Sequence, residues 1–323
     1  MRRFGGLDER DQKTMTVRRV AAIIVHYGDP KRTIRAVLNH WRLEVFSDIV
    51  IVANDLSQQP EALQDIRCTW LIPARNIGFG GACQLGAMSC PADVYAFFNP
   101  HVRIDRPAVG HCISAFDVKD VGIAAPYIHH TGIKGPISDW RNAHCTRTYS
   151  RFLGLPIQVP VENRLVDCKS DPVELIDNDW ASGGVIFCRS EVIRDIKWDG
   201  SYFLGFEDVD ISMRTKKAGW RVVIAPLAIA FHSGESTRTS ASSAYYRMRN
   251  PLWFARKYHS RTVQVLLTAY ILLLVGRLAA GDLLKRRRPT RSRPATRGVL
   301  HGWLLWPGSL EALPDEPLWS SES

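Results

Sequence analysis

Three acidic side chains, Glu207, Asp208 and Asp210, stand together in the second half of the chain. They occupy the expected start of a helix whose last turn is basic, so the charges complement the helix dipole at both ends. A well-capped surface helix would account for that pattern alone. The aromatic and apolar run from Tyr202 to Phe206 precedes the acids, however, and its expected burial would raise the proton affinity of a neighbouring carboxylate. A carboxylate tuned in this way can serve as a general base, and Glu207 and Asp208 are the candidates.

A histidine is expected at the end of a strand shortly after this helix. The apolar run from Val222 to Ala225 is predicted to stop at Pro226, and Ile229 to Phe231 then leads to His232, close to Gly234. A carboxylate and an imidazole would therefore both lie where loops begin.

The segment F-E-D-V-D, followed by R-x-x-x-A-G-W, a proline and a histidine with a nearby glycine, resembles the family 2 glycosyltransferases. The bacterial rhamnosyltransferase-like enzymes are the most similar subgroup. In that family the second residue of the E-D pair deprotonates the acceptor hydroxyl, and the histidine beyond it can bind the divalent metal. The resemblance, which covers roughly residues 18–250, implies these roles for Asp208 and His232.

Polar residues follow each apolar run in the first part of the chain. Asp29 and Pro30 are typical of a helix N-terminus, and a helix-spaced apolar pattern follows them. The predicted strands are 20–25, 49–53, 69–72, 94–98 and 121–125, the last ending at Pro126. Strands that alternate with helices predict a parallel sheet with right-handed crossovers and a ligand site at the carboxyl ends of the strands.

A glycine-rich segment, Gly78 to Gly81, opens one of these helices. It does not complete a dinucleotide-binding fingerprint, because Cys83 stands where the third glycine would be. Close helix packing and direct substrate contact are two equally weighted interpretations. In the resembling family an N-x-G-x-[GA] segment lines the donor pocket. The predicted donor-binding residues are Tyr27, Asn54, Asp55, Asn76, Gly78 and Asn99.

The corner Asn99-Pro100-His101 departs from the family pattern, in which it is N-P-D or D-x-D. The resemblance implies that Asn99 contacts the nucleotide sugar and that the third position binds metal. His101 can still ligate a divalent cation, but imidazole favours transition metals, so His101 and His232 predict a site that prefers Mn²⁺ with Mg²⁺ possible. The alternative is a solvated loop histidine without a role.

Residues 127–178 show little periodicity and are interpreted as acceptor-side loops. A small-residue turn follows them and leads into a predicted strand, Val185 to Cys188. The resemblance places this turn near the transferred sugar, and it contributes Trp180, Gly183 and Gly184 as acceptor-side candidates.

The net charge of +10 is concentrated in residues 247–301, which contain thirteen Lys and Arg and one Asp. Such a segment requires an anionic partner. Aromatic residues interleaved with the basic ones, and an apolar stretch next to them, favour an anionic membrane surface over nucleic acid.

That apolar stretch, Val265 to Gly276, has only twelve residues before Arg277 and Asp282 interrupt it. A spanning helix needs roughly 20 residues, so an in-plane or re-entrant helix is predicted. The run Lys285 to Arg288 would then lie on the cytoplasmic leaflet.

Seven cysteines without a C-x-x-C pair suit a reducing cytoplasm, and residues 1–17 resemble a disordered lead-in rather than a signal peptide. The predicted units are 1–17, a nucleotide-sugar half at 18–126, a catalytic half at 127–246, the basic segment and an acidic tail at 302–323.

The resemblance implies an α/β protein of GT-A type, with a Rossmann-like, mostly parallel sheet and a membrane-associated C-terminal segment. It implies an inverting glycosyltransferase that moves a rhamnose-like deoxyhexose from a nucleotide diphosphate to a polyprenyl-linked or cell-envelope glycan. We expect it on the cytoplasmic inner face of the plasma membrane. A membrane-bound, inactive sugar-nucleotide- or glycan-binding protein is the alternative, suggested by His101.

Overall fold

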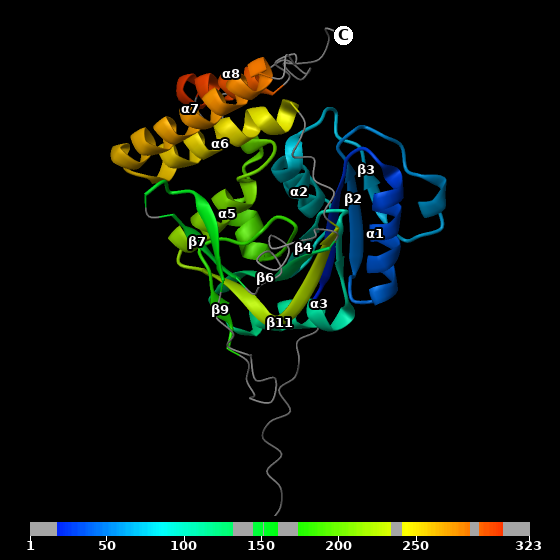
Figure 1. Ribbon diagram of the computed structural model, residues 1–323. Coiled ribbons are helices and arrows are strands. Elements are labelled where there is room, and N and C mark those ends of the chain that lie inside the picture. Colours follow the sequence, from blue (N-terminus) through cyan, green and yellow to red (C-terminus); the bar gives the residue numbers. More distant parts are fainter. Residues whose placement is uncertain are drawn as a thin grey trace, which may run out of the picture.

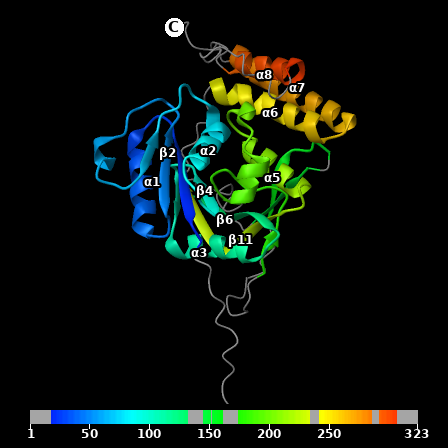
Figure 2. The same ribbon diagram turned by 180° about the vertical axis from the view of Figure 1, so that it is seen from behind.

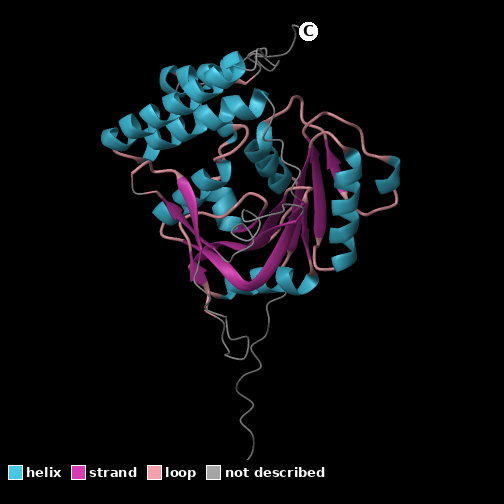
Figure 3. Ribbon diagram, viewed as in Figure 1, coloured by secondary structure: helices cyan, strands magenta, loops and turns pink. Residues whose placement is uncertain are grey.

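The computed structural model describes residues 18–131, 145–150, 152–160, 174–233, 241–284 and 291–305. Within them a mixed sheet carries helices on both faces (Figures 1 and 3). The strands are β1 Val20–His26, β2 Asp48–Ala53, β3 Thr69–Leu71, β4 Val94–Phe98, β5 Val102–Ile104, β6 Val121–Thr131, β7 Cys145–Tyr149, β8 Pro156–Pro160, β9 Ile176–Asp177, β10 Val185–Arg189 and β11 Arg221–Ser233. The longer helices are α1 Pro30–Leu43, α2 Gly78–Met88, α3 Arg106–Ser114, α5 Glu207–Lys217, α6 Ala241–Tyr258, α7 Arg261–Leu284 and α8 Ser292–Leu304.

The main sheet has the strand order β3-β2-β1-β4-β10-β6-β11-β5, and β9 pairs with β11. Strands β3, β2, β1 and β4 run parallel, as the alternation of strands and helices predicts. Strand β10 is antiparallel to both β4 and β6, whereas β6 and β11 are parallel to each other. The predicted α/β class with a largely parallel sheet is therefore confirmed.

Successive residues of β1 contribute to two separate hydrophobic cores, because side chains of a strand alternate between its faces. Ala22 and Ile24 pack on the side covered by α1 and α3. Ala21 and Ile23 pack on the side covered by α2 and α5. Helix α1 begins as predicted, with Asp29 accepting a hydrogen bond from the Lys31 amide at 3.0 Å.

Two strands run past the prolines that were expected to end them. β6 continues through Pro126 and β11 through Pro226, so those predicted strand ends are wrong. The register between the two strands shifts at this level: Ile224 pairs with Ala125, and the next pair joins Ile229 to Tyr127. A bulge of this kind removes proline from the hydrogen-bonded ladder and lets the strand continue. The interpretation of residues 127–178 as loops is also wrong in part, because β7 and β8 form a second, two-stranded sheet.

Helices α6, α7 and α8 form a layer at one side of the molecule, next to α2 and α5, as both views show (Figures 1 and 2). Helix α7 has 24 residues, twice the predicted twelve, and is long and apolar enough to cross a membrane by length and composition. Arg277 and Asp282 do not interrupt it, because helix geometry continues through both. The basic run 285–288, the lead-in 1–17, Gly234 and most of the acidic tail lie outside the described residues.

Candidate active site

Asp208 lies in the first turn of α5, which begins at Glu207 as predicted. Its Oδ2 accepts a hydrogen bond from the backbone amide of Gly183 at 2.7 Å, and its Oδ1 lies 2.9 Å from the Val209 amide nitrogen. Gly183 comes from the turn before β10, and a side chain there would crowd Asp208, since a Cβ would lie 3.3 Å from Oδ2. The structure thus joins a predicted acceptor-side residue to the predicted base.

The two adjacent carboxyl groups bind protons more tightly than ordinary acids. Burial raises the pKa of Asp208, although the hydrogen bonds from Gly183 and Val209 oppose that shift. Burial, and then the charge of Asp208, raise the pKa of Glu207 to about 8. Glu207 is therefore mostly protonated near pH 7, which leaves Asp208 as the stronger acid of the pair. The direction of both shifts agrees with the sequence argument from the apolar run.

The loop before α5 has an unusual backbone. Phe203, Gly205 and Phe206 all have positive φ angles, of 64°, 83° and 76°. A positive φ at a bulky residue is an outlier that costs on the order of 1 to 3 kcal/mol. The burial expected of this run is met in part: Tyr202 is fully buried and Phe203 and Phe206 are half-buried, whereas Leu204 is exposed. A loop in this conformation needs other parts of the chain to hold it.

The glycine-rich segment is one of those parts. Gly78 has a φ of +71°, and a Cβ at this position would lie 2.5 Å from the carbonyl oxygen of Phe203. The Phe79 amide donates to that same oxygen at 2.8 Å, and a Cβ on Gly80 would lie 3.2 Å from the Glu207 Cβ. Of the two interpretations of this segment, close packing is thus observed directly, against the loop that carries the acids. Contact with a donor stays a prediction.

The other predicted donor residues lie beyond β1, β2, β3 and β4. The Asn54 side chain is buried and bonds the Ile77 amide and the Gly78 carbonyl, at 3.0 and 2.9 Å. Asn76 accepts a hydrogen bond from the Gly78 amide at 3.0 Å. Both asparagines therefore shape the start of α2 with their side-chain oxygens, whatever else they contact.

Asp55 and Tyr27 lie on the loops after β2 and β1. The Asp55 Oδ2 accepts from the Gly28 amide at 2.8 Å and lies 3.3 Å from the His26 Nε2. Partial burial alone would raise the pKa of Asp55, but hydrogen bonds from Ser57 and Gly28 hold it below its usual value. Tyr27 is 69% exposed, so its ring is accessible to a ligand.

The two histidines of the predicted metal corner are brought together across 131 positions of the chain. Strand β11 pairs with β5, and the rings of His101 and His232 stack with centroids 5.9 Å apart. Arg32 of α1 lies beside them, with Nη1 3.3 Å from the His101 Nδ1. Asn99 accepts from the His101 amide at 3.0 Å and its own amide donates to the Gly184 carbonyl at 3.0 Å.

Two imidazoles at this spacing offer nitrogen ligands to a transition metal, as the donor set predicts. Among the described residues no group of three or more His, Cys, Asp or Glu side chains is arranged to hold a metal ion. The protein part of such a site would thus be these two rings, and further ligands would have to come from a bound substrate.

Trp180 belongs to a separate buried cluster with Tyr202, Trp253 and Phe254, below α6. Its Nε1 donates to the Thr148 carbonyl of β7 at 3.0 Å. The described geometry therefore gives Trp180 a packing role between the second sheet and α6. Its contact with an acceptor stays a prediction.

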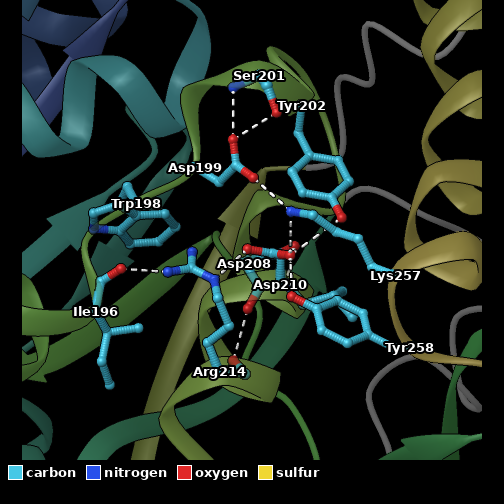
Figure 4. A network of polar contacts seen from close by, with 12 residues as sticks. Ile196, Trp198, Asp199, Ser201, Tyr202, Asp208, Asp210, Arg214, Lys257 and Tyr258 are labelled. Atoms are coloured by element: carbon cyan, nitrogen blue, oxygen red, sulfur yellow. Dashed lines mark hydrogen bonds and ion pairs between the residues drawn. The ribbon is translucent and has the colours of Figure 1, made fainter. Parts of the chain in front are cut away.

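A buried polar network that the sequence did not reveal joins α5 to α6 (Figure 4). Its centre is Asp210, whose side chain is 0% exposed. The Asp210 Oδ1 accepts from Tyr258 at 2.6 Å and from Lys257 at 3.2 Å, and Oδ2 accepts from Arg214 at 2.7 Å. Lys257 also binds Asp199 at 2.7 Å. Both Lys257 and Tyr258 belong to the segment that the sequence predicts to be membrane-associated, because a sequence does not show which polar side chains of a basic stretch point inward.

The fold is similar to that of glycosyltransferases of known structure. It resembles GalNAc-T7 with UDP, GalNAc and Mn²⁺, with a TM-score of 0.58 and 13% identity over 77% of this chain and 49% of that one. It also resembles the mannosyltransferase PcManGT from Pyrobaculum calidifontis in complex with GDP-Man and Mn²⁺, with a TM-score of 0.54 and 11% identity over 88% and 87%. The chain spans about half the length of the GalNAc-T7 structure.

Residues 140–296 match the family model described as glycosyltransferase (GlcNAc). Comparison with curated protein sequences gives no match. At identities near 12% the structural likeness establishes the fold alone, and the family model adds the class of domain. The chain therefore has a GT-A fold, and residues 140–296 within it match a glycosyltransferase family model.

Proposed function

We propose that this protein is an inverting glycosyltransferase in which Asp208 is the general base. The observation that carries the proposal is the Asp208 carboxylate, which is half-buried, raised in pKa and fixed by the Gly183 amide in a GT-A fold. A base of this kind must be ionised at working pH yet bind a proton well. We assign the role to Asp208 because the pKa of its neighbour Glu207 is raised to about 8, which keeps Glu207 mostly protonated near pH 7.

The reaction is a direct displacement at the anomeric carbon. Asp208 takes the proton of an acceptor hydroxyl while the oxygen forms a bond to the anomeric carbon of the donor. The bond from that carbon to the diphosphate oxygen breaks, and the nucleoside diphosphate leaves with the electron pair. Attack from the face opposite the leaving group inverts the configuration. General base catalysis of this kind is typically worth about 10² to 10⁴ in rate.

Residues at the carboxyl ends of β1, β2 and β4 would hold the donor. Asp55 and Tyr27 lie together on adjacent loops, and Asn99 links the next strand to Gly184. His101 and His232 would hold a divalent metal, which when bound would neutralise charge on the diphosphate. Arg32 beside His101 contributes a fixed positive charge to the same corner.

We favour dTDP-rhamnose as donor because the E-D segment and its surroundings resemble the rhamnosyltransferase-like enzymes. UDP-GlcNAc is the second candidate, from the description of the matching family model. The acceptor we propose is a polyprenyl-linked or cell-envelope glycan. Hydrolysis of dTDP-rhamnose, UDP-GlcNAc and GDP-mannose by the purified protein tests the donor, because water can replace the acceptor.

We expect hydrolysis of one of these donors, and we expect Mn²⁺ to support it at least about tenfold better than Mg²⁺, because Mg²⁺ demands oxygen ligands. His101→Ala should reduce the advantage of Mn²⁺. His111→Ala, on helix α3 and outside the proposed metal corner, should leave it unchanged. Donor binding without any turnover would favour the inactive binding protein instead, and equal rates with Mg²⁺ and Mn²⁺ in both proteins would refute the histidine site.

We propose further that the protein sits on the inner face of the plasma membrane through α7 and α8. Leu267, Ile271 and Val275 pack α7 against α6 and α8, which ties the helix to the folded domain along its length. A helix held in this way fits an in-plane position, with its opposite side in the lipid. Exposed apolar side chains on that layer include Val265, Leu266, Leu272, Leu273, Leu283, Leu284, Leu300, Trp303 and Leu304.

The double substitution Leu272→Glu with Leu273→Glu should weaken binding to liposomes that contain anionic phospholipid by at least about tenfold. Both side chains are more than half exposed, so the fold should not change, whereas burial of each Leu in lipid is worth roughly 1.5 to 3 kcal/mol. Met88→Glu, at a 75% exposed position of α2, is the matched control. If the double variant and wild type sediment equally with the liposomes, α7 is not the membrane-binding surface.

A further inference from the structure

Two neighbouring side chains of α6 hold the loop that precedes the catalytic helix. Asn250 Nδ2 lies within hydrogen-bond distance of the carbonyl oxygens of Tyr202, Leu204 and Gly205, at 3.0, 3.0 and 2.6 Å. Arg249 Nη2 donates to the carbonyl oxygens of Ser201 and Tyr202, at 3.0 and 2.7 Å. Both side chains are fully buried. One pair of residues thus satisfies four of the five carbonyl groups from 201 to 205.

The orientation of this pair is itself fixed. Arg249 Nε donates to Asn250 Oδ1 at 2.8 Å, so the amide nitrogen of Asn250 must face the loop. The guanidinium carbon of Arg249 lies 3.9 Å from the centroid of the Trp253 ring and 4.6 Å from that of Tyr246. Stacking between two aromatic rings leaves a guanidinium little freedom, and a lysine cannot reproduce it.

The loop needs such support because its backbone is strained at Phe203 and Phe206, both with positive φ. Strained residues persist only where their surroundings determine the conformation. Four carbonyl groups of this loop are bonded by Arg249 and Asn250 of α6, and the two residues after Phe206 are Glu207 and Asp208. A change in the loop would therefore move the carboxylate away from the Gly183 amide.

We infer that Arg249 and Asn250 are positioning residues of the active site, which act by fixing residues 201–205 and thereby the place of Asp208. The inference rests on the proposed function, since it needs Asp208 to be the base. It assigns a role in the reaction to α6, the helix that also carries α7 and α8 on its other side.

Asn250→Asp is the decisive variant, because it keeps the size of the side chain and places an oxygen opposite three carbonyl oxygens. We expect kcat for donor hydrolysis to fall at least tenfold, with the donor Kd within about threefold of wild type. Each rate is divided by the concentration of donor-binding sites, so that unfolded protein does not count. That concentration is measured by titration with whichever of dTDP-rhamnose, UDP-GlcNAc and GDP-mannose is hydrolysed fastest. Asn250→Ser, which keeps one donor group, replaces it if Asn250→Asp does not fold, with the same expected direction.

Arg256→Gln is the matched control on the same helix. Arg256 Nη1 also contacts three carbonyl oxygens, at 2.8 to 2.9 Å, but they belong to Gly302, Trp303 and Leu305 at the end of α8. Its kcat should stay within about twofold of wild type. A similar loss of kcat in Arg256→Gln and Asn250→Asp would overturn the inference, because any disturbance of α6 would then suffice.

A double variant separates positioning from general damage. If Asn250 acts through Asp208, adding Asn250→Asp to Asp208→Asn should lower the residual rate by less than twofold, because effects of residues that act as a unit are not additive. A further tenfold loss, or a loss of donor binding, would overturn the inference. If Asp208→Asn turns over donor at the wild-type rate, the proposed base is refuted. If Asp208→Asn is slow but Asn250→Asp has the wild-type rate, only the positioning role is refuted.

Discussion

Asp208→Asn is expected to lower turnover of the nucleotide-sugar donor at least about a hundredfold while donor affinity stays unchanged. The substitution keeps the shape of the side chain and removes its basicity, and loss of a general base typically costs 10² to 10⁴ in rate. The Gly183 amide, which now donates to Oδ2, can still donate to the amide oxygen of an asparagine. The variant should therefore fold and bind donor, so kcat falls and the Kd does not.

The pH dependence gives the same assignment a second readout. A base works only when it is deprotonated, so the rate should fall as the pH drops through the pKa of Asp208. Because burial raises that pKa, the loss should set in at a higher pH than for an exposed aspartate. A rate profile that is flat between pH 4 and 7 would argue against Asp208 as the base.

Glu207→Gln is the informative companion variant. The pKa of Glu207 is raised to about 8, so its side chain is mostly uncharged at neutral pH and a glutamine resembles it. We expect a loss of less than about tenfold at pH 7. A loss in Glu207→Gln as large as in Asp208→Asn would move the base assignment to Glu207.

Local patterns predicted the elements that bear the candidate site. The apolar run of β1 and the Asp29-Pro30 helix start were read correctly because a buried parallel strand and a capped helix each leave a signature within a few residues. The start of α5 at Glu207 is another case, since its charges follow the helix dipole. Such signatures depend only on neighbours in the sequence.

The errors arose where distant parts of the chain decide the outcome. Pro126 and Pro226 end strands by local rules, yet a bulge between paired β6 and β11 accommodates both. The polar interruptions of α7, at Arg277 and Asp282, say nothing about helix length once that helix packs on α6 and α8.

The support of the site was invisible to sequence reasoning for the same reason. The net charge of the stretch 247–301 indicates an anionic partner. Three of its polar side chains instead bond oxygens inside the protein: Arg249 and Asn250 bond backbone carbonyl groups, and Lys257 bonds a carboxylate. Only the position of α6 against the loop before α5 distinguishes them from the surface cations.

The carboxylate at the centre of the α5 to α6 network should dominate the stability of this part of the fold. Asp210 is fully buried and is shared by Tyr202, Tyr258, Lys257 and Arg214. Asp210→Ala removes the common acceptor and leaves buried donors without it, and breaking a buried pair from one side costs on the order of 3 to 5 kcal/mol. We expect that loss in the free energy of unfolding by urea.

Asp177→Ala is the matched control, because Asp177 also pairs with an arginine, Arg221, at 2.8 Å but is 66% exposed. Exposed pairs contribute roughly 0 to 1 kcal/mol, so its unfolding midpoint should shift little. The comparison isolates burial, since both substitutions remove one carboxylate from an ion pair with arginine. If the two variants lose similar stability, the Asp210 network does not hold α6 against α5. The apolar contacts of Trp253 and Phe254 with Tyr202 would then be what holds α6 in place.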